Sequence, residues 1–220
     1  WWASMQTTDN GIVNFCVPSG NFGNIFAGFS AHNMGLPVER FIVASNRNDV
    51  LDRFFRNGEM ELRDVAPTYS PSMDIQVSSN FERLLFEVFE RDGLRVEQAF
   101  KALRSKGSLS VSGNILAGIQ RKWASFKVSD DGIIDEIKNT YSKSKYLLDP
   151  HSAVGVRAAK TAISEGRVDD NIPLISLACA HPAKFDAVVT KATGFAPKLP
   201  PHLINLMKRP ERQHHVAATV

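Results

Sequence analysis

Hydrophobic residues occur along the chain in short runs that alternate with longer, helix-like patterns. Residues 11–18 form an apolar run that ends at a proline, which is typical of a buried strand. The segment 24–34 has small and apolar residues and ends before Gly35, a signal for the end of a helix. Residues 38–44 predict a second strand, and residues 50–57 predict a second helix. This is a β-α-β-α unit, so the crossover between its strands should be right-handed.

The rest of the chain continues this alternation after a helical middle. Between about residues 80 and 145, apolar positions recur every three or four residues with charges between them, which predicts helices. Residues 150–165 predict another helix, 173–179 a buried strand, and Pro182 the start of a further helix. The alternation indicates a three-layer α/β fold, with a largely parallel sheet and helices on both faces.

The boundaries follow from these patterns. We expect an α/β domain over residues 1–197, in which the helical stretch 80–145 is an insertion. Residues 198–220 are rich in proline and predict an extended arm that lies on the surface. At 220 residues, the chain is long enough to bury a substantial core.

Composition and charge exclude several classes of protein. Hydrophobic residues make up 43% of the chain and charged residues 22%, which is ordinary for a globular domain and argues against disorder. No run approaches the roughly 20 apolar residues that a membrane helix needs. The net charge of +3 is scattered along the chain, which does not support nucleic-acid binding.

The two cysteines and the first residues bear on the compartment. Cys16 and Cys179 both lie in apolar, strand-like surroundings, which suits a reducing compartment better than a disulfide framework. We therefore expect a cytoplasmic protein. The chain starts at Trp1, without a charged leader region or a cleavage site, and we expect it to begin in the middle of a domain.

A glycine-containing loop between the first strand and the first helix is the sharpest chemical feature. The sequence PSGNFGN at 18–24 places backbone N–H groups and a helix N-terminus together, and its glycines leave room for an anion. This predicts a phosphate cradle. A tight turn that needs glycine only for its backbone explains the loop equally well. The loop lacks the lysine of a Walker loop and the three-glycine dinucleotide fingerprint, which weakens a nucleotide-binding interpretation.

Five motifs in one order give the chain a family resemblance. They are PSGNFGN, ASNRND, SPSMDI, LDPHSAVG and AHPAKF, at residues 18–24, 44–49, 70–75, 148–155 and 180–185. In this order the chain resembles the C-terminal portion of threonine synthases. The resemblance implies a pyridoxal-phosphate (PLP) enzyme of the tryptophan synthase β fold type. Such an enzyme is a lyase of threonine biosynthesis that converts O-phospho-L-homoserine and water to L-threonine and phosphate.

The resemblance also implies cofactor-binding residues. Cys179 stands where the family usually has a threonine that meets the pyridine nitrogen of the cofactor, and a thiol is a weaker but still neutral hydrogen-bonding group. From the sequence alone, a cysteine at a strand end is more often a small core residue. By resemblance, five residues are expected to donate backbone N–H groups to the cofactor phosphate, namely Gly20, Asn21, Phe22, Gly23 and Asn24. The side chains of Ser19 and of the asparagines are expected to assist them.

The lysine that binds the cofactor covalently is absent from this chain by the same resemblance. The family has it in a Ser-Phe-Lys-Asp-like motif well before the glycine loop, so we expect it in a preceding part of the enzyme and expect this chain alone to be inactive. Ser125-Phe126-Lys127 imitates that motif, but it follows the glycine loop and lies among charged residues. We expect Lys127 to be a solvated loop residue on a different face from the glycine loop. No catalytic residue is assigned within the chain.

Other polar residues have both a functional and a structural interpretation. Asn46, Asn48 and Asp49 follow the second strand, where they could orient cofactor or substrate oxygens or simply end the strand and cap a helix. Asp149 is expected to cap a helix, and His151 to border the cleft.

Four further residues are assigned no catalytic or metal-binding role. His181 and Lys184 are expected to be structural rather than catalytic. The pair at 214–215 has no partners at metal-ligand spacing, so no metal site is predicted.

Two rival functions remain open at this stage. One is another lyase of the same fold type, such as a serine or threonine dehydratase, although those enzymes typically have a glycine-only loop. The other is a non-catalytic phosphate-binding or interaction module, which the missing lysine would permit. A lysine motif upstream of Trp1 would favour the enzyme, and a start codon there would favour the module.

Overall fold

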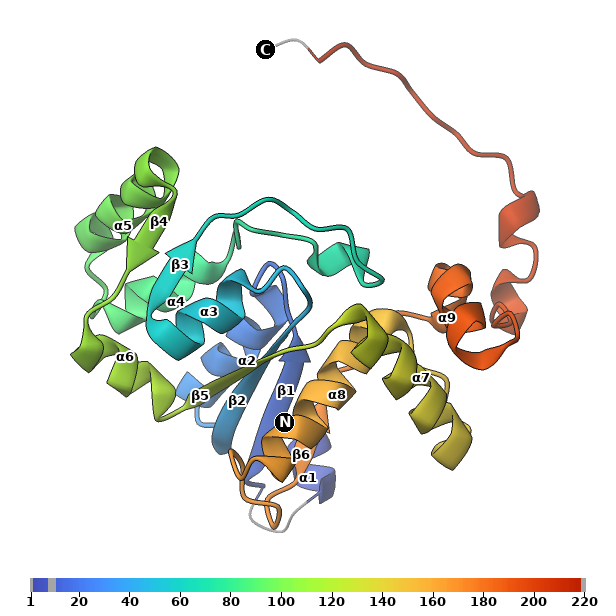
Figure 1. The fold of residues 1–220 in the computed structure, drawn as a ribbon, viewed down its shortest axis with the longest axis horizontal. Coiled ribbons are helices and arrows are strands. Elements are labelled where there is room, and N and C mark those ends of the chain that lie inside the picture. Colours follow the sequence, from blue (N-terminus) through green and yellow to red (C-terminus); the bar gives the residue numbers. More distant parts are fainter. Residues whose placement is uncertain (1, 8–10, 219–220) are drawn as a thin grey trace.

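A four-stranded parallel sheet forms the centre of the computed structural model, which describes residues 2–7 and 11–218 (Figure 1). The strands lie in the order β5-β2-β1-β6, and every neighbouring pair is parallel. A separate antiparallel pair joins β3 and β4. The strands are β1 (Val13–Pro18), β2 (Val38–Ser45), β3 (Glu59–Glu61), β4 (Ser108–Ser110), β5 (Trp123–Lys127) and β6 (Leu174–Ser176).

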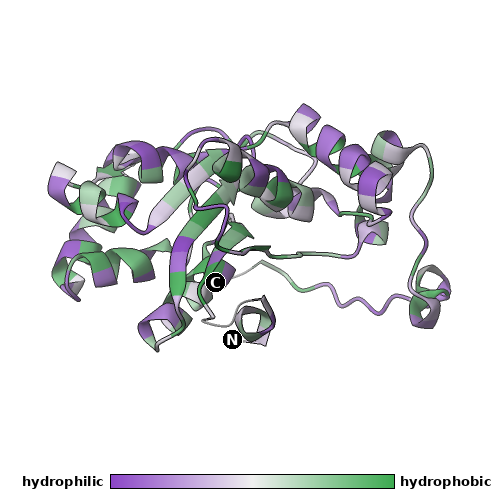
Figure 2. Ribbon diagram, turned by 90° about the horizontal axis from the view of Figure 1, so that it is seen from below, coloured by the Kyte–Doolittle hydropathy of each residue, from purple (hydrophilic) through white to green (hydrophobic). Residues whose placement is uncertain are grey.

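Helices cover both faces of the central sheet, which confirms the predicted three-layer α/β fold (Figure 1). Helices α2, α3 and α4 lie on one side, and α7 and α8 lie on the other. Most helices carry both hydrophilic and hydrophobic residues (Figure 2). The α-helices are α1 (Trp2–Thr7), α2 (Gly23–Asn33), α3 (Val50–Asn57), α4 (Phe81–Val88), α5 (Gly93–Lys106), α6 (Gly113–Gln120), α7 (Asp130–Ser144), α8 (Pro150–Ser164) and α9 (Asp186–Thr193). The 3-10 turns are η1 (Pro71–Met73), η2 (Pro182–Phe185), η3 (Pro201–Leu203) and η4 (Leu206–Lys208).

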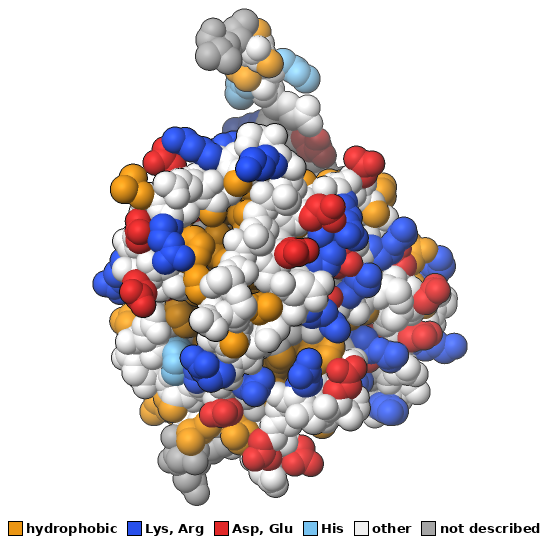
Figure 3. Space-filling model, turned by 60° about the vertical axis from the view of Figure 1, so that its left-hand side comes forward, with side chains coloured by type: hydrophobic (Ala, Val, Ile, Leu, Met, Phe, Trp, Pro, Cys, Tyr) orange, Lys and Arg blue, Asp and Glu red, His pale blue; other side chains and the backbone are white. Residues whose placement is uncertain are grey.

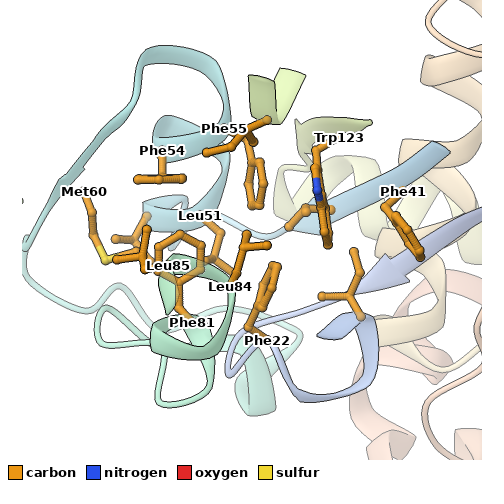
Figure 4. Close-up of a cluster of buried hydrophobic side chains, with 14 of the residues drawn as sticks. Phe22, Phe41, Leu51, Phe54, Phe55, Met60, Phe81, Leu84, Leu85 and Trp123 are labelled. Carbon is orange, nitrogen blue, oxygen red and sulfur yellow. The ribbon is translucent and has the colours of Figure 1, made fainter. Parts of the chain in front are cut away.

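One face of the sheet packs against a cluster of aromatic rings (Figure 4). The Trp123 ring lies 4.9 Å from the Phe41 ring and 5.6 Å from the Phe22 ring, measured between centroids. Phe22 also meets Phe81 edge-on at 5.3 Å. Such pairs contribute about 0.5–1.5 kcal/mol each beyond the burial of their area. The cluster therefore joins β2 and β5 to the loop before α2 and to α4.

The other face packs against the small residues of α8. Because side chains of a strand alternate between the faces, Cys16 and Ile42 point to this side while their neighbours point to the aromatic cluster. Gly155 lets α8 approach the ends of β1 and β6 closely. A Cβ atom at Gly155 would lie only 2.8 Å from Cγ of Pro18 and from Oγ of Ser176.

The segment 80–145 differs from the predicted helical insertion, because it contains two strands. Residues 108–110 form β4, and Trp123–Lys127 form β5, which pairs with β2 in the central sheet. Trp123 faces the aromatic cluster, whereas Phe126 faces α8 and α7. This alternation is only five residues long, and its pairing partner lies some 80 residues earlier in the chain. The hydrophobic pattern of the surrounding residues has the period of a helix, so the sequence did not predict this strand.

The predicted last strand is shorter than expected. Strand β6 covers only Leu174–Ser176, and its residues are half-buried rather than buried. The Leu177 N–H still donates to the carbonyl of Cys16 at 3.0 Å, and residues 178–181 leave the sheet as a loop. Cys179 is therefore an exposed loop residue beyond the strand, not a residue within it.

The C-terminal segment and the surface complete the description. Residues 198–218 contain two 3-10 turns and then extend away from the rest of the molecule, whereas the sequence predicted an arm that lies on the surface (Figure 1). Acidic and basic side chains are interspersed on the face drawn in Figure 3. Over the described residues, no helix has the length and apolar character required to cross a bilayer.

Candidate functional site

The glycine loop connects the end of β1 to α2 and is built around Phe22. Phe22 precedes α2 with a positive φ of 64°, and its ring is fully buried in the aromatic cluster. The Phe22 N–H donates to Oγ of Ser19 at 3.1 Å, and the Ser19 N–H donates to the carbonyl of Ala44 at 2.9 Å. The loop is thus fixed at both ends, to strand β2 and to the core.

Four of the five predicted backbone donors of this loop have no acceptor among the described residues. They are the N–H groups of Gly20, Asn21, Gly23 and Asn24. Phe22 is the exception, because its left-handed conformation directs its N–H to Ser19. In this structure the Phe22 N–H is therefore not available to the predicted anion, whereas the other four N–H groups are free within the described part of the chain. Unpaired N–H groups at the start of an 11-residue helix favour an anion.

The two glycines of the loop have different reasons to be glycine. A Cβ atom at Gly20 would lie 3.1 Å from Cα of Met73 and 3.0 Å from Cδ1 of Ile75, so a side chain there would force these neighbours to shift by a few tenths of an ångström. A Cβ atom at Gly23 would meet only Nδ2 of Asn80, at an ordinary 3.5 Å. Both interpretations of the loop therefore have physical support: close packing favours glycine at position 20, and the absence of a side chain at Gly23 leaves space beside the free N–H groups.

The loop borders a cleft of about 170 Å³ that also contains the predicted cysteine. Gly20 and Cys179 both line it, together with Ser72, His151 and Lys184. Lys184 is exposed and has no ion pair among the described residues. The sequence predicted that Cys179 shares a cleft with residues 19–24, and of these residues Gly20 lines the same cleft as Cys179.

Cys179 is a protonated thiol at neutral pH. Desolvation by the surrounding protein, with a smaller contribution from the charge of Asp149, raises the pKa of the Cys179 thiol to about 11. Its backbone N–H donates to Oγ of Ser152 at 2.9 Å. The other cysteine, Cys16, is fully buried under α8, and burial raises the pKa of its thiol as well. Cys179 thus presents a neutral S–H to the cleft.

A buried polar cluster lies behind the cleft at the start of α8. Asp149 caps the helix, as predicted, by accepting from the N–H groups of His151 and Ser152. Burial opposes ionisation of Asp149, but the hydrogen bonds from His151, Ser152 and Ala180 together outweigh it and lower the pKa of this carboxyl. Ser152 and Ser72 lie within the motifs LDPHSAVG and SPSMDI, but neither was predicted as a site residue. A local signal for Ser152 is that it follows the capping residue by three positions.

Asn46 and Asn48 hold a loop rather than facing the cleft. Both donate through Nδ2 to Oδ1 of Asp74, at 2.8 and 2.9 Å, and Asn48 also pairs with both backbone groups of Ala66. Of the two readings of these asparagines, the structure supports the one in which they are structural. They anchor the long connection after β3 to the end of β2.

Lys127 is exposed, as predicted, but it is the last residue of β5 rather than a loop residue. Its Nζ atom donates to Oδ2 of Asp49 at 2.9 Å, and Arg53 donates to Oδ1 of the same carboxylate at 2.9 Å. Lys127 is not one of the residues that line the cleft, and β5 is separated from β1 by β2. Asp49 is therefore engaged in ion pairs and does not face the cleft.

No metal centre accompanies the cleft. Among residues 2–7 and 11–218, no three His, Cys, Asp or Glu side chains are grouped so that they could hold a metal ion. His214 and His215 lie exposed in the C-terminal segment.

Comparison with known proteins places this architecture in one family. The family model "Threonine synthase, C-terminal" matches residues 152–220. The threonine synthase of Pseudomonas aeruginosa is 47% identical over 201 residues, which cover 91% of this chain and 42% of that protein. The chain is homologous to the C-terminal part of threonine synthases. The enzyme of Saccharomyces cerevisiae is 44% identical over 86% of this chain and 39% of its own length.

Solved threonine synthases share the fold as well as the sequence. A PLP-bound threonine synthase from Brucella melitensis superposes with a TM-score of 0.89 at 44% identity, covering 96% of this chain and 44% of that one. The yeast threonine synthase gives a TM-score of 0.86 at 38% identity, covering 96% of this chain and 45% of that one. The chain thus spans less than half the length of the threonine synthases that it matches.

A more distant likeness extends only to the fold. Threonine deaminase isoform 2 from Solanum lycopersicum has a TM-score of 0.53 at 15% identity, covering 87% of this chain and 44% of that one.

Proposed function

We propose that the chain belongs to a threonine synthase that converts O-phospho-L-homoserine and water to L-threonine and phosphate with PLP. The main support for the proposal is that Gly20 of the glycine loop, which has further free N–H groups at residues 21, 23 and 24, lines the same cleft as Cys179. The similarity to a PLP-bound threonine synthase at 44% identity supports the same assignment.

The residues of the cleft fit the cofactor. A phosphate group suits the free N–H groups of Gly20, Asn21, Gly23 and Asn24, because the start of α2 adds positive charge at that point. The space beside Gly23 leaves this face of the loop open. Ser19 accepts from Phe22 and keeps its own hydroxyl proton to donate. We infer that these groups hold the phosphate of PLP.

Cys179 suits the opposite end of the cofactor. When bound, PLP supplies an electron sink that stabilises negative charge developing on the substrate carbon. The Cys179 thiol keeps its proton at neutral pH and can donate a weak hydrogen bond to the pyridine nitrogen. A carboxylate at this position would instead keep that nitrogen protonated. The cysteine therefore preserves the neutral character that a threonine would give.

Lys184 is the candidate for binding a negative group of the substrate. Lys184 lines the cleft, its Nζ atom lies 5.7 Å from the centre of the Phe185 ring, and no carboxylate among the described residues pairs with it. O-phospho-L-homoserine carries a phosphate and a carboxylate, so an unpaired cation in the cleft would attract either group. This replaces the purely structural role that the sequence suggested for Lys184.

The remainder of the proposed enzyme supplies the lysine that binds PLP covalently. The chain spans 42% of its Pseudomonas relative, which leaves room for that residue outside the 220 residues. We propose that the partner of this chain is the N-terminal part of the same enzyme, that the enzyme works in the cytoplasm, and that the 220 residues alone form threonine no faster than free PLP does.

Borohydride reduction of the PLP-loaded, full-length protein tests this assignment. We expect one labelled lysine upstream of Trp1, together with threonine formation from O-phospho-L-homoserine. Stoichiometric label on Lys184 or Lys127 would overturn the placement of the covalent lysine. A full-length protein that binds inorganic phosphate but neither binds PLP nor forms threonine would favour a non-catalytic phosphate-binding module. Turnover by the purified 220-residue chain would refute the proposal that the essential lysine lies outside these residues.

A further inference from the structure

The buried carboxylate of Asp149 connects three walls of the cleft. Asp149, His151 and Ser152 are 1%, 3% and 4% exposed, so their polar atoms depend on protein partners. Capping α8 requires only the N–H groups of His151 and Ser152. Asp149 makes further bonds that leave the helix, and these reach the residues that line the cleft.

The first connection fixes the loop that carries Cys179. The Ser152 hydroxyl donates to Oδ2 of Asp149 and accepts the N–H of Cys179 at 2.9 Å. The N–H of Ala180 donates to the same Oδ2 atom at 3.2 Å. Two successive amides of this loop thus end on one carboxylate, directly or through one hydroxyl. Because the loop lies beyond β6, these bonds rather than sheet pairing set the position of Cys179.

The second connection runs through His151 to the turn that faces the glycine loop. Nδ1 of His151 lies 3.0 Å from Oδ1 of Asp149, and Nε2 accepts the N–H of Ser72 at 3.1 Å. These partners assign the proton to Nδ1 and leave Nε2 as an acceptor. The turn at Ser72 and Met73 packs directly against Gly20, whose missing Cβ would lie 3.1 Å from Cα of Met73. The carboxylate therefore reaches the glycine loop through two contacts.

Electrostatics adds a second effect of the same carboxylate. Asp149 is balanced by N–H and O–H donors, and no Lys or Arg of the described residues forms an ion pair with it. Its negative charge disfavours a thiolate at Cys179. The other charged or titratable groups of the cleft are His151 and Lys184.

We propose that Asp149 is a positioning residue for the PLP cleft. It holds the Cys179 loop and the Ser72 turn in fixed positions relative to the glycine loop. The proposal rests on the proposed function, because it assigns this cleft to PLP. It goes beyond helix capping, since a cap needs neither Ala180 nor Ser72. Asp149 acts through His151 and Ser152 and does not itself line the cleft.

Two variants of the full-length protein test the proposal. Ser152→Ala removes the link to Cys179, and we expect PLP affinity to fall about 10-fold, the size of one lost buried hydrogen bond. Asp149→Asn removes the charge, and we expect the pH profile of Cys179 alkylation, followed by peptide mass spectrometry, to move to lower pH. This readout tracks the thiol and does not depend on turnover.

Matched controls separate positioning from simple stability. Ser152→Thr keeps the hydroxyl and should restore PLP affinity. Asp92 caps α5 in the same way, by accepting from Leu94 and Arg95, but it is exposed and does not line the cleft. Asp92→Asn should therefore leave both PLP affinity and the alkylation profile unchanged. If Asp149→Asn does not fold, the Ser152 pair decides the proposal.

The outcomes distinguish this proposal from the function on which it rests. Unchanged PLP affinity in Ser152→Ala, or an equal loss in Ser152→Thr, would overturn the positioning role. An alkylation profile that does not move in a folded Asp149→Asn variant would overturn the electrostatic part. Failure of the unmodified protein to bind PLP would instead refute the proposed function, while the alkylation profile would still report whether Asp149 controls Cys179.

Discussion

Gly155 on α8 and Pro18 at the end of β1 approach so closely that a methyl group between them would lie 2.8 Å from Cγ of the proline. The same methyl group would lie 2.8 Å from Oγ of Ser176 on β6. Neither neighbour is the flexible end of a long side chain. The contact therefore sets how closely α8 covers the strand ends next to the cleft.

Gly155→Ala should destabilise the fold because α8 must move away from β1. We expect a loss of about 1–3 kcal/mol in the free energy of unfolding, as for other overpacked cores, measured by urea denaturation. Gly118→Ala in α6 is the matched control, since its Cβ would meet only the end of Arg121 at 3.6 Å. The control should gain up to about 1 kcal/mol from helix propensity. Equal stabilities of the two variants would contradict the close-packing argument.

Gly23→Val should abolish anion binding with little loss of stability. The valine side chain would fill the space beside the free N–H groups, while its Cβ makes only an ordinary contact with Asn80. Titration of the full-length protein with PLP and with inorganic phosphate measures the effect. Gly20→Ala should behave differently, because its Cβ would meet the backbone of Met73 and so lower the free energy of unfolding. Retained anion binding in Gly23→Val would show that the N–H groups of the glycine loop do not form the anion site.

Cys179→Ser should retain PLP binding. A hydroxyl offers the same neutral hydrogen-bonding role as the protonated thiol and is a stronger donor. The absorbance spectrum and dissociation constant of bound PLP provide the measurement. Cys179→Asp is the informative contrast, because a carboxylate would favour a protonated pyridine nitrogen and alter the spectrum. A serine variant that loses PLP would show that the thiol itself is required.

Lys184→Gln should raise the KM for O-phospho-L-homoserine more than it lowers kcat. The amide keeps most of the side-chain length but removes the only lysine charge among the described residues that line the cleft. We expect a rise in KM of about 10-fold, since one charge-assisted hydrogen bond contributes roughly 1.5–3 kcal/mol. Partial recovery in Lys184→Arg would support a role for the charge. A Lys184→Gln variant with unchanged KM would remove Lys184 from substrate binding.

Lys127→Gln should lower the free energy of unfolding at neutral pH but not at acid pH, and it should not affect PLP binding. Burial opposes the ionisation of Asp49, but its bonds to Lys127 and Arg53 lower the pKa of the carboxyl overall. The pair therefore stabilises the protein above the unfolded pKa of about 3.9, and this stability is lost as the pH falls through the lower folded value. Because Lys127 is half-exposed, we expect a loss of at most about 1 kcal/mol at pH 7. Urea denaturation should show that the free energy of unfolding differs less between pH 7 and pH 3 in the variant than in the unmodified protein. A large loss of PLP would show that Lys127 belongs to the site.

The parts of the fold that local sequence determines were predictable. The β1-loop-α2 unit depends on an apolar run, a proline and two glycines that are neighbours in the chain, and the structure has it where the pattern predicts it. Strand β5 was missed because its five residues acquire their role only by pairing with β2. The extent of β6 was overestimated because an apolar run does not reveal where sheet pairing stops.

The candidate site also contains parts that local sequence predicts and parts that depend on residues far apart in the chain. The glycine loop is local, and Cys179 was found only through the family resemblance. The cluster around Asp149 depends on amides at Ser72 and Ala180, which lie 77 residues before and 31 residues after it. No periodicity connects such positions. Asn46 and Asn48 were ambiguous for the same reason, since their partners Asp74 and Ala66 lie 28 and 18 residues later in the chain.

Phe22 gives the glycine loop a property that its free N–H groups alone would not have. Its ring is packed between Phe81, Phe55 and Trp123, so the left-handed turn at its backbone is maintained by the core (Figure 4). The loop cannot rearrange without separating these rings. An arriving anion therefore meets a preorganised receptor and gives up little conformational entropy of the chain on binding. Amide hydrogen exchange at Phe22, whose N–H donates to Ser19, should consequently be governed by opening of the aromatic core, both before and after the anion binds.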